Sequence, residues 1–200
     1  MRIHGYFPLA AAMLTLLAFS PNSPAQNKDK GKDKDQHVAS HYDPYERSKA
    51  DTDLIRETRH RLLMLPYYGV FDDLGFQVNG GTVTLTGQVT RPTLKSDAAS
   101  TVKDVPGVTN VVNNIEVLPL SPTDDAARIA LYRAIYGDSA LSARYAYRAA
   151  PSIHIIVKNG HVRLEGVVAN QMDKQIAEMR AKGVSGIFSV DNELQIEGKN

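Results

Sequence analysis

The residues that could do chemistry in this chain are few, and the only close histidine pair in a segment that is expected to fold is His154 with His161. Two imidazole nitrogens at about 2.1 Å from one ion would begin a zinc site. If Asn159-Gly160 is a two-residue hairpin turn, both histidines face the same side of the hairpin but lie about 10 Å apart along it. One metal ion cannot take both. The same register sets His154 opposite Glu165, which favours a cross-strand polar pair on the sheet surface.

The acidic pair Asp72-Asp73 would suit acid–base catalysis only if both carboxylates faced one substrate. Adjacent strand residues point to opposite faces, so the pair is predicted to serve a turn or a strand entry. The chain has no Gly-x-Ser-x-Gly pattern, no glycine-rich phosphate loop and no cysteine. The sequence therefore predicts a protein that is not an enzyme and that uses no metal and no cofactor.

One segment, residues 132–148, interleaves tyrosines with arginines in a way that suits a membrane surface. Tyrosine rings can lie at the boundary of the lipid headgroups, and arginines can bind phosphates through two hydrogen bonds. Alternatively, the tyrosines pack in the core and the arginines form a solvated rim. If the segment binds lipid, the predicted binding residues are Arg133, Tyr136, Arg144, Tyr145, Tyr147 and Arg148.

These side chains belong to a sequence that is present twice. Residues 74–117, moved forward by 79 positions without a gap, match residues 153–196 at 13 of 44 positions. The shared residues are mostly glycines and apolar residues, such as Gly87 with Gly166. A match at a fixed period indicates one supersecondary unit in two copies. A fold is duplicated here, and no reactive group travels with it.

Each copy predicts the order helix, strand, strand, helix, strand. The predicted fold is α+β, with two tandem αββαβ modules, each a three-stranded mixed sheet that has two helices on one face. The opposite face is expected to be open to solvent. Strand alternation places one set of side chains inward: Leu74, Phe76, Val78, Val83 and Leu85 in the first copy, and Ile153, Ile155, Val157, Val162 and Leu164 in the second.

Two further pairs of repeated residues carry structural expectations. Gly87 and Gly166 fall on the inward side, where a missing side chain would let a helix approach the sheet. Asn113 and Asn192 lie in the last strand with the parity of the apolar positions. A half-buried amide must find partners, so we expect each to bond the neighbouring backbone.

These repeated residues resemble a BON domain. The pattern in the first copy is Gly81-x-Val83-x-Leu85-x-Gly87-x-Val89 followed by Gly107-Val108-x-x-Val111-x-Asn113-x-Ile115-x-Val117, and the second copy repeats it from Gly160 to Ile196. The resemblance implies a bacterial envelope protein associated with phospholipid binding and membrane attachment, with no catalytic residue set. It favours a non-enzymatic module that contacts an anionic phospholipid surface, with envelope stress protection as a role. The alternative is a scaffold whose open sheet faces or edges bind another envelope protein.

The ends and boundaries follow from composition. An apolar run over residues 6–19, followed by Ser23-Pro24-Ala25, predicts a signal peptide at 1–25 with cleavage near Ala25. The run is shorter than a membrane-spanning helix needs, which disfavours an anchor. Residues 26–50 are predicted to be a disordered charged tether, residues 51–118 the first module and residues 121–197 the second. The location is then periplasmic or secreted.

Charge excludes one class of partner. Removal of the predicted signal takes away Arg2 and leaves 22 basic and 22 acidic residues. A nucleic-acid-binding protein would show a basic stripe. Nucleic acid is therefore not expected among the partners.

Overall fold

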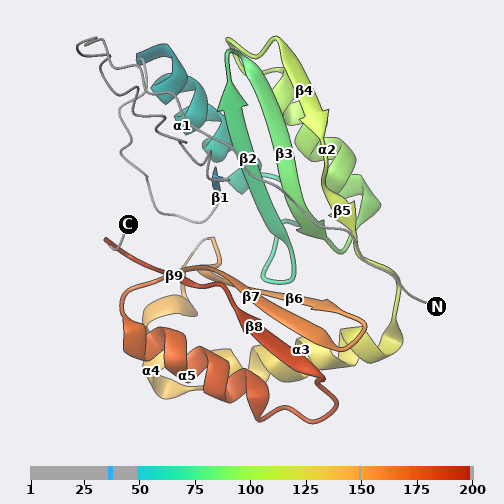
Figure 1. The fold of residues 1–200 in the computed structure, drawn as a ribbon, viewed down its shortest axis with the longest axis vertical. Coiled ribbons are helices and arrows are strands. Elements are labelled where there is room, and N and C mark those ends of the chain that lie inside the picture. The colour runs from blue at the N-terminus through green and yellow to red at the C-terminus, as the bar shows by residue number, and fades with distance from the viewer. Residues whose placement is uncertain (1–35, 38–48, 149, 199–200) are drawn as a thin grey trace, which may run out of the picture. The chain divides into compact units, whose positions relative to one another are not determined.

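The computed structural model describes residues 36–37, 49–148 and 150–198, which belong to the unit that spans Asp33–Asn200 (Figure 1). The first module contains β1 (Gln36–His37), α1 (Lys49–Leu63), β2 (Asp73–Asn79), β3 (Thr82–Val89), α2 (Pro92–Lys103), β4 (Asn110–Asn113) and β5 (Glu116–Val117). The second contains α3 (Pro122–Tyr136), α4 (Ser139–Tyr145), β6 (Ile153–Lys158), β7 (His161–Val168), α5 (Gln171–Lys182), β8 (Ser189–Asn192) and β9 (Gln195–Ile196).

The α+β fold in two repeated modules is confirmed. In each module a central strand, β3 or β7, pairs antiparallel with the strand before it and parallel with the last strand. The last strand runs as two short stretches, β4 with β5 and β8 with β9. The predicted hairpin register is confirmed, since Val157 pairs with Val162 and His154 with Glu165. The helix α4 is an addition that the repeat does not predict.

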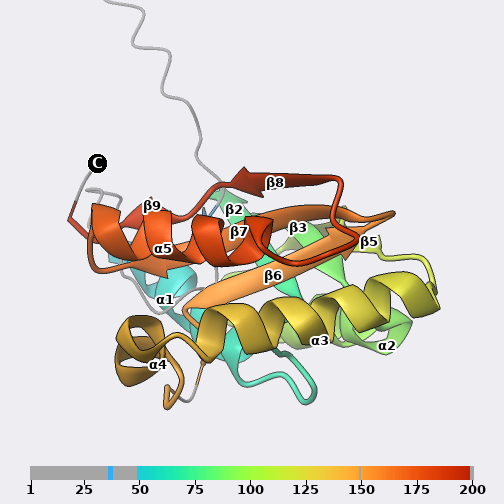
Figure 2. The same cartoon turned by 90° about the horizontal axis from the view of Figure 1, so that it is seen from below.

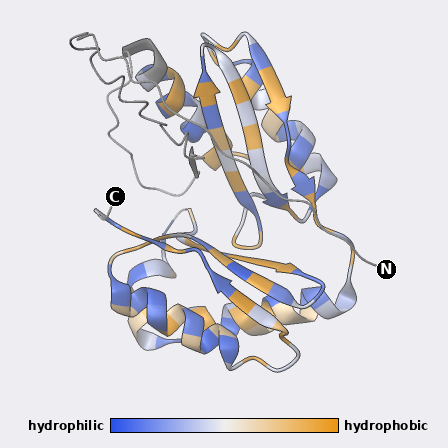
Figure 3. Ribbon diagram, viewed as in Figure 1, coloured by the Kyte–Doolittle hydropathy of each residue, from blue (hydrophilic) through white to orange (hydrophobic). Residues whose placement is uncertain are grey.

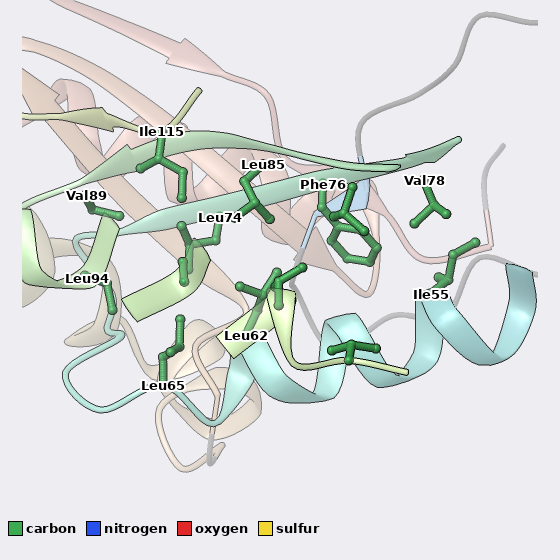
Figure 4. Packing of buried hydrophobic residues seen from close by; sticks show 14 of the residues in the cluster. Ile55, Leu62, Leu65, Leu74, Phe76, Val78, Leu85, Val89, Leu94 and Ile115 are labelled. Carbon is green, nitrogen blue, oxygen red and sulfur yellow. The ribbon is translucent and has the colours of Figure 1, made fainter. Parts of the chain in front are cut away.

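The inward side chains of the first sheet form its core together with α1 and α2. All five predicted inward residues are buried, and Leu62 of α1 and Leu94 of α2 are buried with them. Figure 4 shows Leu62 and Leu65 directed toward Leu74 and Phe76 of β2. The alternating colours along β2 and β3 in Figure 3 are the sequence alternation that produces this face. Both helices therefore cover one face of the sheet.

The second core repeats this arrangement, with α3 and α5 packed on the face of β6 and β7 (Figure 2). Its five predicted inward residues are fully buried, together with Leu131, Ile135 and Ala177 from the two helices. Asp124 of α3 closes one end. Its carboxylate accepts hydrogen bonds at 2.8 and 2.9 Å from the amides of Asn159 and Gly160, which form the hairpin turn.

The prediction for the paired asparagines is confirmed. The Asn113 amide donates to the Lys95 carbonyl at 2.8 Å and accepts from the Ile115 amide. Asn192 donates in the same way to the Lys174 carbonyl at 2.9 Å. Each side chain thus joins the interrupted last strand to the second helix of its module.

The reason predicted for the repeated glycines is wrong. Gly87 and Gly166 have φ of 109° and 114°, a region that side chains disfavour. A Cβ on Gly166 would lie 2.3 Å from the Ser152 carbonyl oxygen, and one on Gly87 would lie 2.2 Å from that of Asp73. The missing side chain makes room for the backbone of the adjoining strand and not for a helix.

The expectation of an open outer face is wrong for the second sheet. His154, Ile156 and Glu165 point away from the core, yet they are 1%, 2% and 7% exposed. Residues 67–72, which we call the docking loop, join α1 to β2 and contact this sheet. The Ile155 amide donates to the Val70 carbonyl at 2.8 Å, and the Tyr68 hydroxyl lies 3.4 Å from Nε2 of His154.

The predicted signal peptide at 1–25 lies outside the described residues, as does most of the predicted tether. Within the predicted tether, Gln36 and His37 form β1 and pair with Phe76 and Gly75 of β2, and α1 begins at Lys49. In the part of the chain that is described, no helix has the length and apolar character to cross a membrane.

The glycine geometry gives a matched test. Gly166→Ala should lower the free energy of unfolding by about 2–4 kcal/mol, because the methyl group meets backbone in a disfavoured conformation. Gly186 has a φ of 84°, with nothing within 4 Å of the place that a Cβ would take, so Gly186→Ala should cost only about 1 kcal/mol. Urea denaturation of both variants measures the difference, and equal costs would contradict the role of the Ser152 carbonyl.

Candidate lipid-contact segment

The tyrosine–arginine segment is divided between two helices. α3 ends at Tyr136, Gly137 follows, and the Asp138 carboxylate caps α4 by accepting from the amides of Ala140 and Leu141. Arg180 of α5 bonds the other oxygen of Asp138, with the nearest nitrogen 2.7 Å away. The break turns the chain, so that the residues of α4 face α5.

Two of the predicted binding residues lie in the core. Tyr136 is 9% exposed, and its hydroxyl donates to the Ile153 carbonyl at 2.7 Å. Burial raises the pKa of Tyr136. Tyr145 is 2% exposed, donates to Oδ2 of Asp173 at 2.6 Å and accepts from the Ala169 amide at 2.8 Å. For these two tyrosines the structure matches the core-packing alternative, and their rings are not available to a headgroup.

Asp173 organises this end of the module. Its buried Oδ2 also accepts from Nη1 of Arg144 at 2.6 Å and from the Asn170 amide at 3.2 Å. The hydrogen bond and charge of Asp173 raise the pKa of the Arg144 guanidinium, which keeps its charge. Arg144 is half exposed at 51%, so one side of the group remains open to solvent.

The remaining predicted residues are on the surface. Tyr147 is 92% exposed, and Arg133 and Arg148 are exposed as well. Nε of Arg148 donates to the Arg144 carbonyl at 3.2 Å, and its guanidinium lies 5.7 Å from the centroid of the Tyr145 ring. Among the described residues, neither Arg133 nor Arg148 has a carboxylate partner. The segment therefore presents Tyr147 beside two arginines, with Arg133 on the preceding helix.

Sequence reasoning missed the carboxylates that hold this segment. Asp138 precedes α4, and Asp173 lies in the first turn of α5, where its spacing from Asn170 indicates a helix start. That signal predicts only a cap, which is present because the Asp173 amide donates to Asn170 at 2.9 Å. The contacts of Asp173 with Arg144 and Tyr145 join parts of the chain almost 30 residues apart, a distance at which a local pattern gives no information.

Neither His154 nor His161 belongs to a metal-binding group in the part of the chain that the structure describes. His161 is exposed, and its Nδ1 lies 2.8 Å from the Ser189 hydroxyl. His154 is buried against the docking loop, where the Asp72 carboxylate accepts hydrogen bonds from Thr90 and Gly69. No group of three or more histidine, aspartate or glutamate side chains in the described ranges could hold a metal ion.

Comparison with known proteins places this fold in a family. The BON domain family matches residues 51–119 and 139–198, more than half of the chain. The chain belongs to the BON domain family, with two copies in tandem. The second match begins after α3, although α3 contributes to the core of that module.

Individual relatives are more distant. Osmotically-inducible protein Y of Escherichia coli (strain K12) is 29% identical over 130 residues, which is 62% of this chain and 61% of that protein. Two structures of CdsD, a structural protein of the type III secretion system of Chlamydia trachomatis, are 16% and 18% identical. They cover 73% and 72% of this chain and 94% and 97% of their own, with TM-scores of 0.28 and 0.26. These TM-scores are too low to support an argument about this chain.

The two neighbouring tyrosines give a second matched test. Tyr145→Phe removes a hydroxyl that bonds both Asp173 and Ala169, and should lower the free energy of unfolding by about 1–3 kcal/mol. Tyr147→Phe changes an exposed ring and should stay within about 0.5 kcal/mol of the parent. Thermal or urea unfolding measures the stability of both variants. An equal effect of the two changes would contradict the buried position of Tyr145.

Proposed function

We propose that this protein is a non-enzymatic envelope protein whose second module contacts anionic phospholipid headgroups through Arg133, Arg144, Tyr147 and Arg148. The observation that carries the proposal is the exposed pair Tyr147–Arg148 beside the half-exposed Arg144. Tyr136 and Tyr145, which the sequence adds to this set, serve the core.

The chemistry of these groups supports the proposal. An almost fully exposed tyrosine presents its apolar ring to water, which is unfavourable. A headgroup layer accommodates both the ring and the hydroxyl. Arginines without carboxylate partners are free to bind phosphate oxygens in pairs of hydrogen bonds. Nε of Arg148 donates to the Arg144 carbonyl, which holds the Arg148 side chain against the end of α4. Attraction to an anionic surface then falls as salt rises.

The family supports the location and the role. BON membership agrees with an envelope protein, and we place it in the periplasm or outside the cell after cleavage near Ala25. The E. coli relative is named for induction by osmotic conditions. This chain spans 61% of that relative, and we propose for it a protective role at the envelope under osmotic stress.

A second candidate is a scaffold that binds another envelope protein along a sheet edge. The last strands support it, because β4 and β8 end the order of strands in their sheets and are paired on one side only within the described residues. An unpaired edge can accept an extended segment of another protein. The outer face of the second sheet is a poor candidate, since the docking loop already covers part of it.

The test is cosedimentation with liposomes of anionic and of zwitterionic lipid. The parent protein should bind anionic liposomes, and the binding should weaken as salt rises. Arg133→Glu with Arg148→Glu should abolish binding without a change in melting temperature, because neither side chain has an ion-pair partner to lose among the described residues. Arg144 is left unchanged, because a glutamate there would lie beside buried Asp173.

The matched control carries the same change of charge on the first module. Arg56→Glu with Lys103→Glu should keep anionic binding if the segment acts as a site, and should lose it if only net charge matters. No binding by the parent to either lipid would contradict the proposal. Capture of an envelope protein in that case, lost when a proline is placed in β8, would support the scaffold.

A further inference from the structure

The two modules meet at a joint formed by the docking loop and the outer face of β6 and β7. The hydrogen bond from the Ile155 amide to the Val70 carbonyl caps the free edge of β6. The ring of Tyr68 lies 5.5 Å from that of His154, with the ring planes at 30°. Val70 and Phe71 also pack against the second core. The joint is thus a packed contact as well as a polar one.

Partly exposed polar side chains form further contacts between the two modules. Glu116 pairs with Lys158 at 2.5 Å, and Gln88 accepts from Arg163 at 2.8 Å. Both members of the Glu116–Lys158 pair are about 40% exposed, and pairs of this kind contribute little in water. The joint therefore depends on its buried part, which comprises the groups around His154 and the apolar contacts of Val70 and Phe71.

His154 is enclosed by groups from both modules. Tyr68, Asp72 and Asp73 face it from the first module, and Glu165 faces it from β7, held at 2.7 Å by Arg163. No hydrogen-bond partner of its Nδ1 is found in the described part of the chain. The repeat places Gly75 and Thr86 where the second module has His154 and Glu165. The titratable pair is therefore particular to the sheet that is covered.

We propose that the joint is acid-sensitive, and that protonation of His154 releases the docking loop from the outer face of β6 and β7. This goes beyond the proposed function and does not depend on it. The neutral imidazole suits the site, because Nε2 can accept the hydrogen bond of the Tyr68 hydroxyl. An imidazolium cannot accept it, and would place a charge where only 1% of the side chain meets solvent.

The electrostatics of the site also favour the neutral form of His154. Burial lowers the pKa of His154 from its ordinary 6.5, while Asp73, Asp72 and the nearby backbone of Gly69 oppose the shift. Burial, with Asp73 and Asp72, also raises the pKa of Tyr68, which therefore remains a donor.

A pKa that is lower in the docked state makes docking weaker in acid. The contribution of His154 is complete above about pH 6.5 and is lost as the pH falls toward the docked pKa. In that window the equilibrium constant for docking should fall by up to about tenfold per pH unit. Release would uncover the Ile155 amide at the edge of β6. Acid would thus expose a free strand edge.

The test is a pH titration of the full chain by nuclear magnetic resonance from pH 7.5 to 5.0, with ¹⁵N relaxation and the ring signals of His154 followed together. The modules should tumble as one body at pH 7.5 and separately in acid, with His154 titrating in the same pH range. His154→Gln keeps a neutral acceptor for Tyr68 and should remain joined throughout. His161→Gln removes an exposed histidine of the same sheet and should behave as the parent.

Each other outcome overturns the proposal. The parent remaining joined to pH 5.0 would do so, as would the same separation in His154→Gln. If His154→Gln fails to dock at pH 7.5, the pH titration of the parent protein is the test. Separation of its modules must then coincide with titration of the His154 ring. Titration without separation, or separation without titration, rejects the mechanism.

Discussion

Each module depends on burying one face of a three-stranded sheet under two helices. The central strand bonds both neighbours, so the alternate side chains of β3 and β7 must all face the helices at once. The asparagines Asn113 and Asn192 tie the interrupted last strand to the helix above it, and Gly87 and Gly166 let the strands meet closely. These are the residues that the two copies share. The duplication therefore preserves what the sheet requires.

The parts that differ between the copies carry the candidate functions. In the first module, residues 64–72 follow α1 and include the docking loop. In the second, α4 and the exposed Tyr147 and Arg148 follow α3. Asp72 explains how such a loop is held: its Oδ1 accepts from the Thr90 amide and hydroxyl at 2.7 and 2.8 Å, and its Oδ2 from the Gly69 amide at 3.2 Å.

The sequence predicts the fold well because the alternation of residues along a strand shows which side chains face the core. The register of the hairpin and all ten inward residues follow from alternation and from the turn at Asn159-Gly160. It does not predict what covers the outer face. One signal was present: Ile156 is an apolar residue on the predicted open side, where the first module has Gln77. The tyrosines of residues 132–148 divide between core and surface, because their burial depends on Ile153 and Asp173, which belong to other elements.

Closure of the β6 edge by the docking loop is the contact that joins the two modules. Alternation directs the Ile155 amide away from β7, so the Val70 carbonyl is what protects it from exchange. Hydrogen exchange of single amides at pH 7.5 measures this directly. We expect Ile155 to exchange as slowly as Ile156, whose amide faces β7 within the hairpin. Exchange of Ile155 at the rate of a free edge amide, with Ile156 still protected, would contradict the closure.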